Sequence, residues 1–350
     1  MAYIAKFTSL NMFFFGTYVD GLEDVVLNDV VVLGNSPTGR VSFVGQVYCG
    51  SVADQDGDCS DDSFPALVNG FGATADFVTA PTNSSQAFVG TLNGTGTAFD
   101  MLARIGGSFD DAFHAILELN GRLYVGGRTN SANLDLEIPD DAGFVPAYAV
   151  KNTDFDAVVG WLLPDGAAAG GTWHATFYGG TGIDLVNCLS AFLDGVFLYG
   201  STTSPGMSLP TQDIGVGGFF NDTFQGGDTP PIDIFFATFE GALQQQIFGT
   251  YIGGPRNDYL GQTGDPRGSN HMFSNNSNLW LGTTIHSGDG NATNNATLPT
   301  NVLPEIISAG SFDPDKSSID GIGTDVHVIF RLGGAGAQLT LLKAVQGAGP

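Results

Sequence analysis

One phrase recurs four times along the chain and constrains its fold more than any other feature. In each copy a short apolar run leads into a glycine turn, and an aspartate follows three or four positions later. The copies lie at Thr17–Asp24, Ala103–Asp111, Phe177–Asp184 and Tyr251–Asp258, at a spacing of roughly 70 to 90 residues. A repeat of this length made of strand-like material predicts an array of β-propeller blades, because each unit needs its neighbours to bury its faces.

The composition fits this interpretation. The 350 residues include 51 glycines and 27 phenylalanines, as expected for many short strands that are joined by tight turns and packed through aromatic layers. Sustained apolar patterns of helical period are absent, so helix should be scarce. A propeller grows by adding blades and remains one domain, so we expect a single all-β domain over residues 1–350.

Each unit contains four segments with strand character. The first strands are expected at Val25–Leu33, Ala112–Leu119, Leu185–Phe192 and, more weakly, Tyr259–Phe273; the second at Val41–Gly45, Arg122–Thr129, Val196–Thr203 and Leu279–Thr284; the third at Ala2–Phe7, Ala87–Leu92, Asp156–Leu162, Asp233–Phe239 and Asp325–Phe330. A fourth strand leads back into each glycine turn, and the last is expected at Leu339–Val345. The predicted blades are 21–106, 107–179, 180–253 and 254–350.

The phase of the repeat is unusual. The chain opens with a third and a fourth strand, so residues 1–20 form only half a blade. Either a two-stranded blade completes a ring of about five blades, or the missing strands come from a longer chain or from a neighbouring molecule. Exposed strand edges favour strand addition, which can lead to polymers.

The order of these elements resembles the SBBP family of β-propeller repeats. The third and fourth units match best, and Leu209-Pro210-Thr211 and Leu298-Pro299-Thr300 complete the pattern. The resemblance implies a propeller found mostly on secreted or surface-attached proteins, and it implies no shared catalytic residue.

The charge is strongly unbalanced. The net charge is −25 because 36 acidic residues face only 11 lysines and arginines. Such a surface repels nucleic acid and anionic membranes, so we expect neither partner. The apolar runs are too short to span a bilayer. No secretory signal is visible in this numbering, and the extracellular or cell-surface location that we expect would require that a signal was removed or lies outside this chain.

An acidic loop in the first unit is the main candidate metal site. Asp54, Asp56 and Asp58 alternate along it, and Asp61 and Asp62 follow. This spacing lets a short loop place oxygen ligands around calcium, although the closing Glu of an EF-hand is missing, and a solvated acidic loop is the alternative. Cys49 and Cys59 bracket the loop and are expected to form a disulfide, which would leave Cys188 as a buried thiol.

The recurring aspartates allow two interpretations. Asp24, Asp111, Asp184 and Asp258 could ring an axis as ligands, or each could cap the backbone N–H groups of its own glycine turn. Capping is favoured, because every blade needs it alike.

No catalytic group is expected. A sialidase-type Asp-box and a G-x-S-x-G nucleophile elbow are both absent from the sequence. The sequence favours a secreted or cell-surface structural or adhesive module that associates with itself or with other extracellular proteins. The alternative is a propeller that binds or acts on carbohydrates through rim loops, with Trp161, Trp173 and Trp280 as stacking platforms, although core packing suits their strand positions better.

Overall fold

The computed structural model contains strands and no helices in the residues that it describes. These are residues 2–19, 24–34, 39–48, 74–78, 85–138, 143–152, 154–164, 172–192, 194–205, 210–211, 222–224, 231–252, 272–275, 278–286, 325–333 and 338–346. The chain divides into two compact units, Met1–Phe177 and Tyr178–Pro350. The expectation of a single domain stays a prediction.

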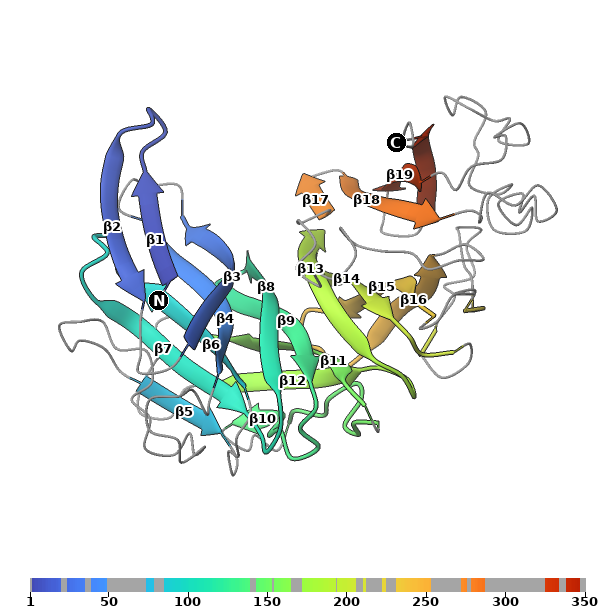
Figure 1. Ribbon diagram of the computed structural model, residues 1–350, viewed down its shortest axis with the longest axis horizontal. Helices are drawn as coiled ribbons and strands as arrows, with labels where there is room; N and C mark the ends of the chain where they lie inside the picture. Colours follow the sequence, from blue (N-terminus) through green and yellow to red (C-terminus); the bar gives the residue numbers. More distant parts are fainter. Residues whose placement is uncertain are drawn as a thin grey trace. The chain divides into compact units, whose positions relative to one another are not determined.

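The first unit begins with the half-blade. Strands β1 (Ala2–Phe7) and β2 (Phe13–Val19) form a two-stranded antiparallel sheet, drawn in dark blue in Figure 1. Blade one follows, with antiparallel strands β3 (Asp24–Leu33), β4 (Arg40–Tyr48), β6 (Gln86–Leu92) and β7 (Phe99–Gly106) in that order. A fifth strand, β5 (Thr74–Val78), is parallel to β7 at the outer edge.

Blade two has the same plan. Its strands are β8 (Asp111–Leu119), β9 (Arg122–Thr129), β11 (Asp156–Leu162) and β12 (Trp173–Tyr178), and the short β10 (Glu137–Ile138) pairs with β12. In blades one and two a segment of a connecting loop therefore covers the outer edge strand. Edge strands that are covered in this way are less prone to unwanted pairing.

The second unit holds two further blades. Blade three consists of β13 (Asp184–Phe192), β14 (Gly195–Thr202), β15 (Asp233–Glu240) and β16 (Gln246–Ile252). Blade four consists of β17 (Met272–Asn275), β18 (Asn278–His286), β19 (Asp325–Gly333) and β20 (Gln338–Gln346). The predicted fold class is confirmed: the described residues are all-β and form four antiparallel four-stranded blades and an N-terminal half-blade.

A β-bulge recurs at one place in the first strands. The register shifts between Leu27 and Asp29 in β3, between Phe113 and Ala115 in β8, and between Val186 and Cys188 in β13. A second register shift recurs opposite the ends of third strands, between Lys6 and Phe7, Thr91 and Leu92, and Thr238 and Phe239. The extra residue at each shift belongs to the fourth strand: Phe14, Asp100 and Ile247. Because bulges fix the local register, these positions define which residues of different blades are equivalent.

The cores lie between neighbouring sheets of the first unit. One cluster joins the half-blade to blade one and includes Ile4, Phe15, Phe43 and Phe88. A second cluster joins blades one and two and includes Trp173. Every residue of β6, β11 and β12 is buried, as expected for strands with a packed layer on each face.

Candidate functional site

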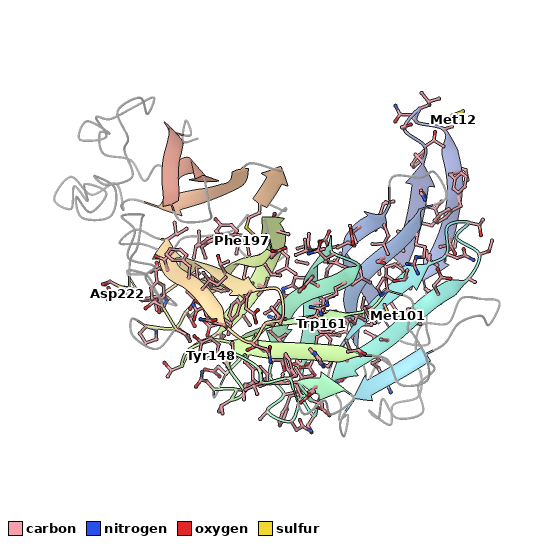
Figure 2. The ribbon with its side chains drawn as sticks, turned by 180° about the vertical axis from the view of Figure 1, so that it is seen from behind. Met12, Met101, Tyr148, Trp161, Phe197 and Asp222 are labelled. Carbon is pink, nitrogen blue, oxygen red and sulfur yellow. The ribbon has the colours of Figure 1, made fainter. Side chains whose placement is uncertain are left out.

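The half-blade exposes a stripe of aromatic side chains on one face. Tyr3 lies against Tyr18 with ring centroids 5.1 Å apart, and Phe7 lies against Phe13 at 5.8 Å. All four side chains are more than half exposed. The opposite face buries Ile4, Phe15 and Val19 against blade one. Figure 2 shows Met12, which is also exposed, at the tip of this hairpin.

Equivalent positions in complete blades are buried. Alignment of the third strands by their register shifts makes Tyr3 equivalent to Phe88 of β6 and Phe235 of β15. Phe7 is equivalent to Leu92 and Phe239 in the same alignment. The exposed fraction of Tyr3 is 53% and that of Phe7 is 57%, whereas all four equivalents are at 0%. The half-blade thus has the side chains of a packed third strand without the neighbours that would cover them.

The inner edge of β1 has no strand beside it in the described residues. In complete blades each third strand pairs on one side with a fourth strand and on the other with a second strand. β1 pairs with β2 alone. An unpaired edge presents a row of backbone donors and acceptors that can extend a sheet.

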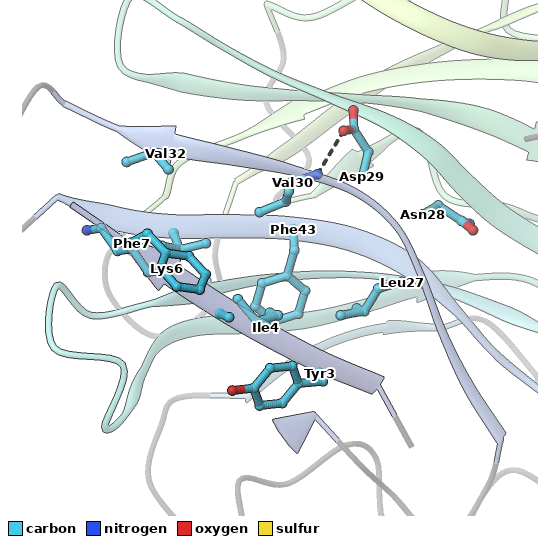
Figure 3. Close-up of a pocket in the computed structure, with 12 residues that line it drawn as sticks. Tyr3, Ile4, Lys6, Phe7, Leu27, Asn28, Asp29, Val30, Val32 and Phe43 are labelled. Carbon is cyan, nitrogen blue, oxygen red and sulfur yellow. Dashed lines mark hydrogen bonds between the residues drawn. The ribbon is translucent and has the colours of Figure 1, made fainter. Parts of the chain in front are cut away.

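A groove of about 420 Å³ runs beside this edge (Figure 3). β1 lines one side, and Leu27, Val30, Val32 and Phe43 contribute apolar side chains from β3 and β4. The polar groups of β3 in this region bond to blade two: Asn28 Nδ2 donates to the Phe113 carbonyl at 2.7 Å, and Asp29 Oδ2 accepts from the Ile116 N–H at 2.9 Å. The groove is therefore largely apolar.

Lys6 is the only charged residue between positions 2 and 19. Its side chain lies at the groove, is largely buried, and donates a hydrogen bond to the Gly39 carbonyl. Its Nζ also lies 5.5 Å from the centre of the Phe14 ring. Burial lowers the pKa of the Lys6 ammonium. Within the described residues no carboxylate forms an ion pair with it, in a chain with 36 acidic groups.

The recurring aspartates of blades two and three accept the same set of hydrogen bonds, from a glycine N–H, a serine hydroxyl and a threonine hydroxyl. We call this arrangement the clasp. Asp111 Oδ2 accepts from the Gly107 N–H at 2.8 Å and from the Ser131 hydroxyl at 2.9 Å, and Oδ1 accepts from the Thr129 hydroxyl. In blade three, Asp184 accepts from the Gly180 N–H at 2.7 Å and from the hydroxyls of Ser204 and Thr202. The capping interpretation is confirmed for these two residues, whose clasps tie the glycine turn to the first and second strands.

The first copy of the motif differs. Counting from the bulges, the residue of β3 equivalent to Asp111 is Val25, which is paired with Val47 as Asp111 is paired with Thr129. Asp24 precedes this position by one residue, so alignment of the sequence motifs gave the wrong register. A shift of one residue reverses the face of a strand, and Asp24 is therefore not equivalent to the other aspartates. Asp258 lies outside the described residues.

A second buried carboxylate lies across the sheet from the blade-two clasp. Thr129 is paired with Asp111 on one side and with Asp156 on the other. Burial raises the pKa of each carboxyl group to about 6, and this effect outweighs hydrogen bonds that lower the pKa, from Thr129, Gly107 and Ser131 to Asp111 and from Asn152 to Asp156. The sequence motif pointed to Asp111, but Asp156 was predicted only as the first residue of a strand.

The proposed calcium ligands and disulfide lie outside the described residues. This holds for Asp54, Asp56, Asp58, Asp61, Asp62, Cys49 and Cys59. In the described part of the chain no cluster of histidine, cysteine or carboxylate side chains could hold a metal ion. The Cys188 thiol is buried, as predicted.

Two of the three tryptophans belong to the blade interior. Trp173 is fully buried, and its Nε1 donates to the Asp135 carbonyl at 2.9 Å. Trp161, labelled in Figure 2, is buried with the Arg122 guanidinium 3.8 Å from its ring centre. Neither presents an open face to a sugar, so core packing is confirmed for both; the side chain of Trp280 lies outside the described residues.

These features define an all-β protein built from propeller-type blades, with a half-blade that exposes aromatic side chains on one face. No protein-family model matches the chain, and no curated protein matches it. None of the described segments forms a helix long and apolar enough to cross a membrane.

Proposed function

We propose that the protein is a secreted or cell-surface structural or adhesive module that acts as a subunit of an extracellular assembly. The observation that carries this proposal is the half-blade, in which Tyr3 and Phe7 are exposed although their equivalents are fully buried. Exposed apolar patches of this kind mark interaction surfaces in soluble proteins. The resemblance of the repeat to SBBP propellers and the near absence of lysine and arginine support a scaffold over an enzyme or a nucleic-acid-binding protein.

Calcium has a supporting role in this proposal. In the sequence, Asp54, Asp56 and Asp58 lie between β4 and β5 of blade one. A bound cation would rigidify the loop and offset part of the negative charge, which otherwise opposes association of like-charged subunits.

The test is the state of association of the purified chain and of surface variants. Light scattering after gel filtration and negative-stain imaging should show oligomers or filaments of the wild type. The double variant Phe7→Asp with Phe13→Asp should shift the population to monomers, because it places charges on the aromatic stripe. Removal of residues 1–17 should also abolish assembly and leave the remaining blades folded.

Phe109→Asp is the matched control, since Phe109 is exposed to the same degree as Phe7 but precedes β8. It should leave association unchanged. A wild-type chain that stays monomeric at high concentration would refute the proposal, and specific signals on a glycan array would favour the carbohydrate-binding alternative.

A further inference from the structure

Among the described strands, the half-blade has no counterpart of the first and second strands that the other blades contain. In blades one, two and three the second strand pairs with the third strand, and the first strand pairs with the second. In blade one, for example, β4 pairs with β6 and β3 pairs with β4. The register shift between Lys6 and Phe7, which matches the shifts at β6 and β15, identifies β1 as a third strand. The edge of β1 that has no paired strand in the described part of the chain therefore faces the place that a second strand occupies elsewhere, and that place contains the groove.

Two valines of β3 that line the groove are exposed, and the position of blade two that is equivalent to one of them is buried. Val30 of β3 is equivalent to Ile116 of β8, since each is the second residue after its bulge. The exposed fraction of Ile116 is 7%, because it lies in the core between blades one and two. Val30 is 55% exposed at the same position, and Val32 beside it is 49% exposed. Two more strands on the half-blade would cover both valines.

Lys6 indicates the charge of the side chain that would lie opposite it on an added second strand. Its equivalent in blade one is Thr91, which is paired with Ser42 of the second strand; their hydroxyl oxygens are 2.8 Å apart. A second strand beside β1 would place one side chain directly opposite Lys6 in the same way. Opposite charges at such positions stabilise a sheet and like charges destabilise it, and Lys6 has no ion pair within the described residues.

We propose that the groove binds a β-hairpin of another polypeptide, which completes the half-blade by strand addition to β1. The hairpin consists of a first and a second strand, with apolar side chains over Val30 and Val32 and a carboxylate opposite Lys6. This inference rests on the proposed role as a subunit of an assembly and names the part of the partner that docks. Main-chain pairing supplies affinity in this mode of recognition, and side chains at alternate positions supply specificity.

A second copy of the chain is a poor donor. The first and second strands of its four blades are already paired within those blades. The half-blade of the second copy cannot fill the groove either. The face of its β1 and β2 that would have to cover Val30 of the first copy is already packed against its own blade one. Two copies joined edge to edge through β1 would bring their first blades into the same space.

The experiment uses a cyclic peptide as the probe. The peptide copies Asp111–Thr129, which includes β8, β9 and the Asn120-Gly121 turn, and a D-Pro-Gly linker closes its open end. Cyclisation keeps the hairpin formed before binding. By register, Tyr124 of the probe would face Lys6, so a second probe carries Tyr124→Glu and a third carries Tyr124→Lys.

Fluorescence anisotropy with the full chain should give saturable binding. The Tyr124→Glu probe should bind about tenfold more tightly than the Tyr124→Lys probe, the ratio expected from replacing a cross-strand repulsion by an attraction. In a Lys6→Met chain this preference should disappear. Equal affinities of the two probes for the wild-type chain would overturn the carboxylate assignment.

Protein variants locate the binding site. Val30→Arg should abolish binding by filling the groove, and it should leave the melting temperature nearly unchanged because Val30 is exposed. Val145→Arg is the matched control, since Val145 is an exposed valine in a loop of blade two. Binding that survives Val30→Arg, or no binding of any probe, overturns the inference.

The two proposals fail separately. If the probe binds to a chain that never assembles, the inference about the groove stands and the proposed function is rejected. Assembly of the wild-type chain, together with no binding of any probe, would give the reverse result.

Discussion

Asp111 and Thr129 are paired across β8 and β9, and the Thr129 hydroxyl donates a hydrogen bond to the Asp111 carboxylate. Asp184 and Thr202 repeat this relationship in blade three. In both blades the same carboxylate also accepts from a glycine N–H and from a serine hydroxyl. The clasp therefore joins the turn between blades to the two strands that begin the next blade.

Removal of the threonine hydroxyl should destabilise the first unit. Thr129→Val keeps the shape of the side chain but takes one donor from a buried carboxylate, which costs about 1 to 3 kcal/mol. Chemical denaturation measures the loss. Thr202→Val should cost a similar amount, whereas Thr223→Val, at an exposed position, should change stability little. A Thr129→Val chain as stable as the wild type would contradict the structural role of the clasp.

The pH dependence of stability should reveal Asp156. Its pKa is about 6 in the folded chain against an ordinary value of 3.8, so between these values the folded state binds more protons than the unfolded state. Stability from this group is thus complete below about pH 4 and is lost as the pH rises through 6. Asp156→Asn removes this dependence.

The melting temperature of Asp156→Asn, relative to the wild type, should therefore increase from pH 4 to pH 7. Comparison at each pH cancels the contribution of the other carboxylates, which the two chains share. A difference that is constant over this range would show that the pKa of Asp156 is not raised.

The sequence predicted the strands of the blades well, for a physical reason. Each strand is bounded by glycine or polar turn residues, and the third strands are buried along their whole length in β6 and β11, so local composition and tertiary burial agree. The weakest prediction, Tyr259–Phe273, overlaps β17 only at Met272 and Phe273.

Register was harder to predict than strand position. Asp24 resembles Asp111 in the sequence motif, yet the bulges place Val25 at the equivalent position. Bulges arise from backbone pairing between strands and leave little trace in one sequence. The half-blade was evident from the order of the strands, but the groove and the largely buried Lys6 depend on how β1 lies over β3 and β4.

Calcium should bind to the acidic loop through Asp54, Asp56 and Asp58, with Asp61 or Asp62 completing the ligand set. Titration calorimetry should show one site, with an affinity in the range of about 10⁻⁴ to 10⁻³ M that is usual for extracellular modules. Asp56→Asn together with Asp58→Asn should abolish the heat. Asp222→Asn, at an exposed position outside the loop, should leave it unchanged. The absence of heat from the wild type at millimolar calcium would exclude the site.

Gly160 of β11 lies against the indole of Trp173 on β12, and a side chain has no room there. A Cβ atom added at Gly160 would lie 2.1 Å from the Trp173 ring. Gly160→Ala should therefore force the fully buried indole to move, at a cost of about 1 to 3 kcal/mol. If the clash is the cause, Trp173→Leu should create the space that alanine needs. The double variant Gly160→Ala with Trp173→Leu should then lose less stability than the two single changes together, which denaturation of all four chains measures. Strict additivity would show that the two residues do not constrain one another.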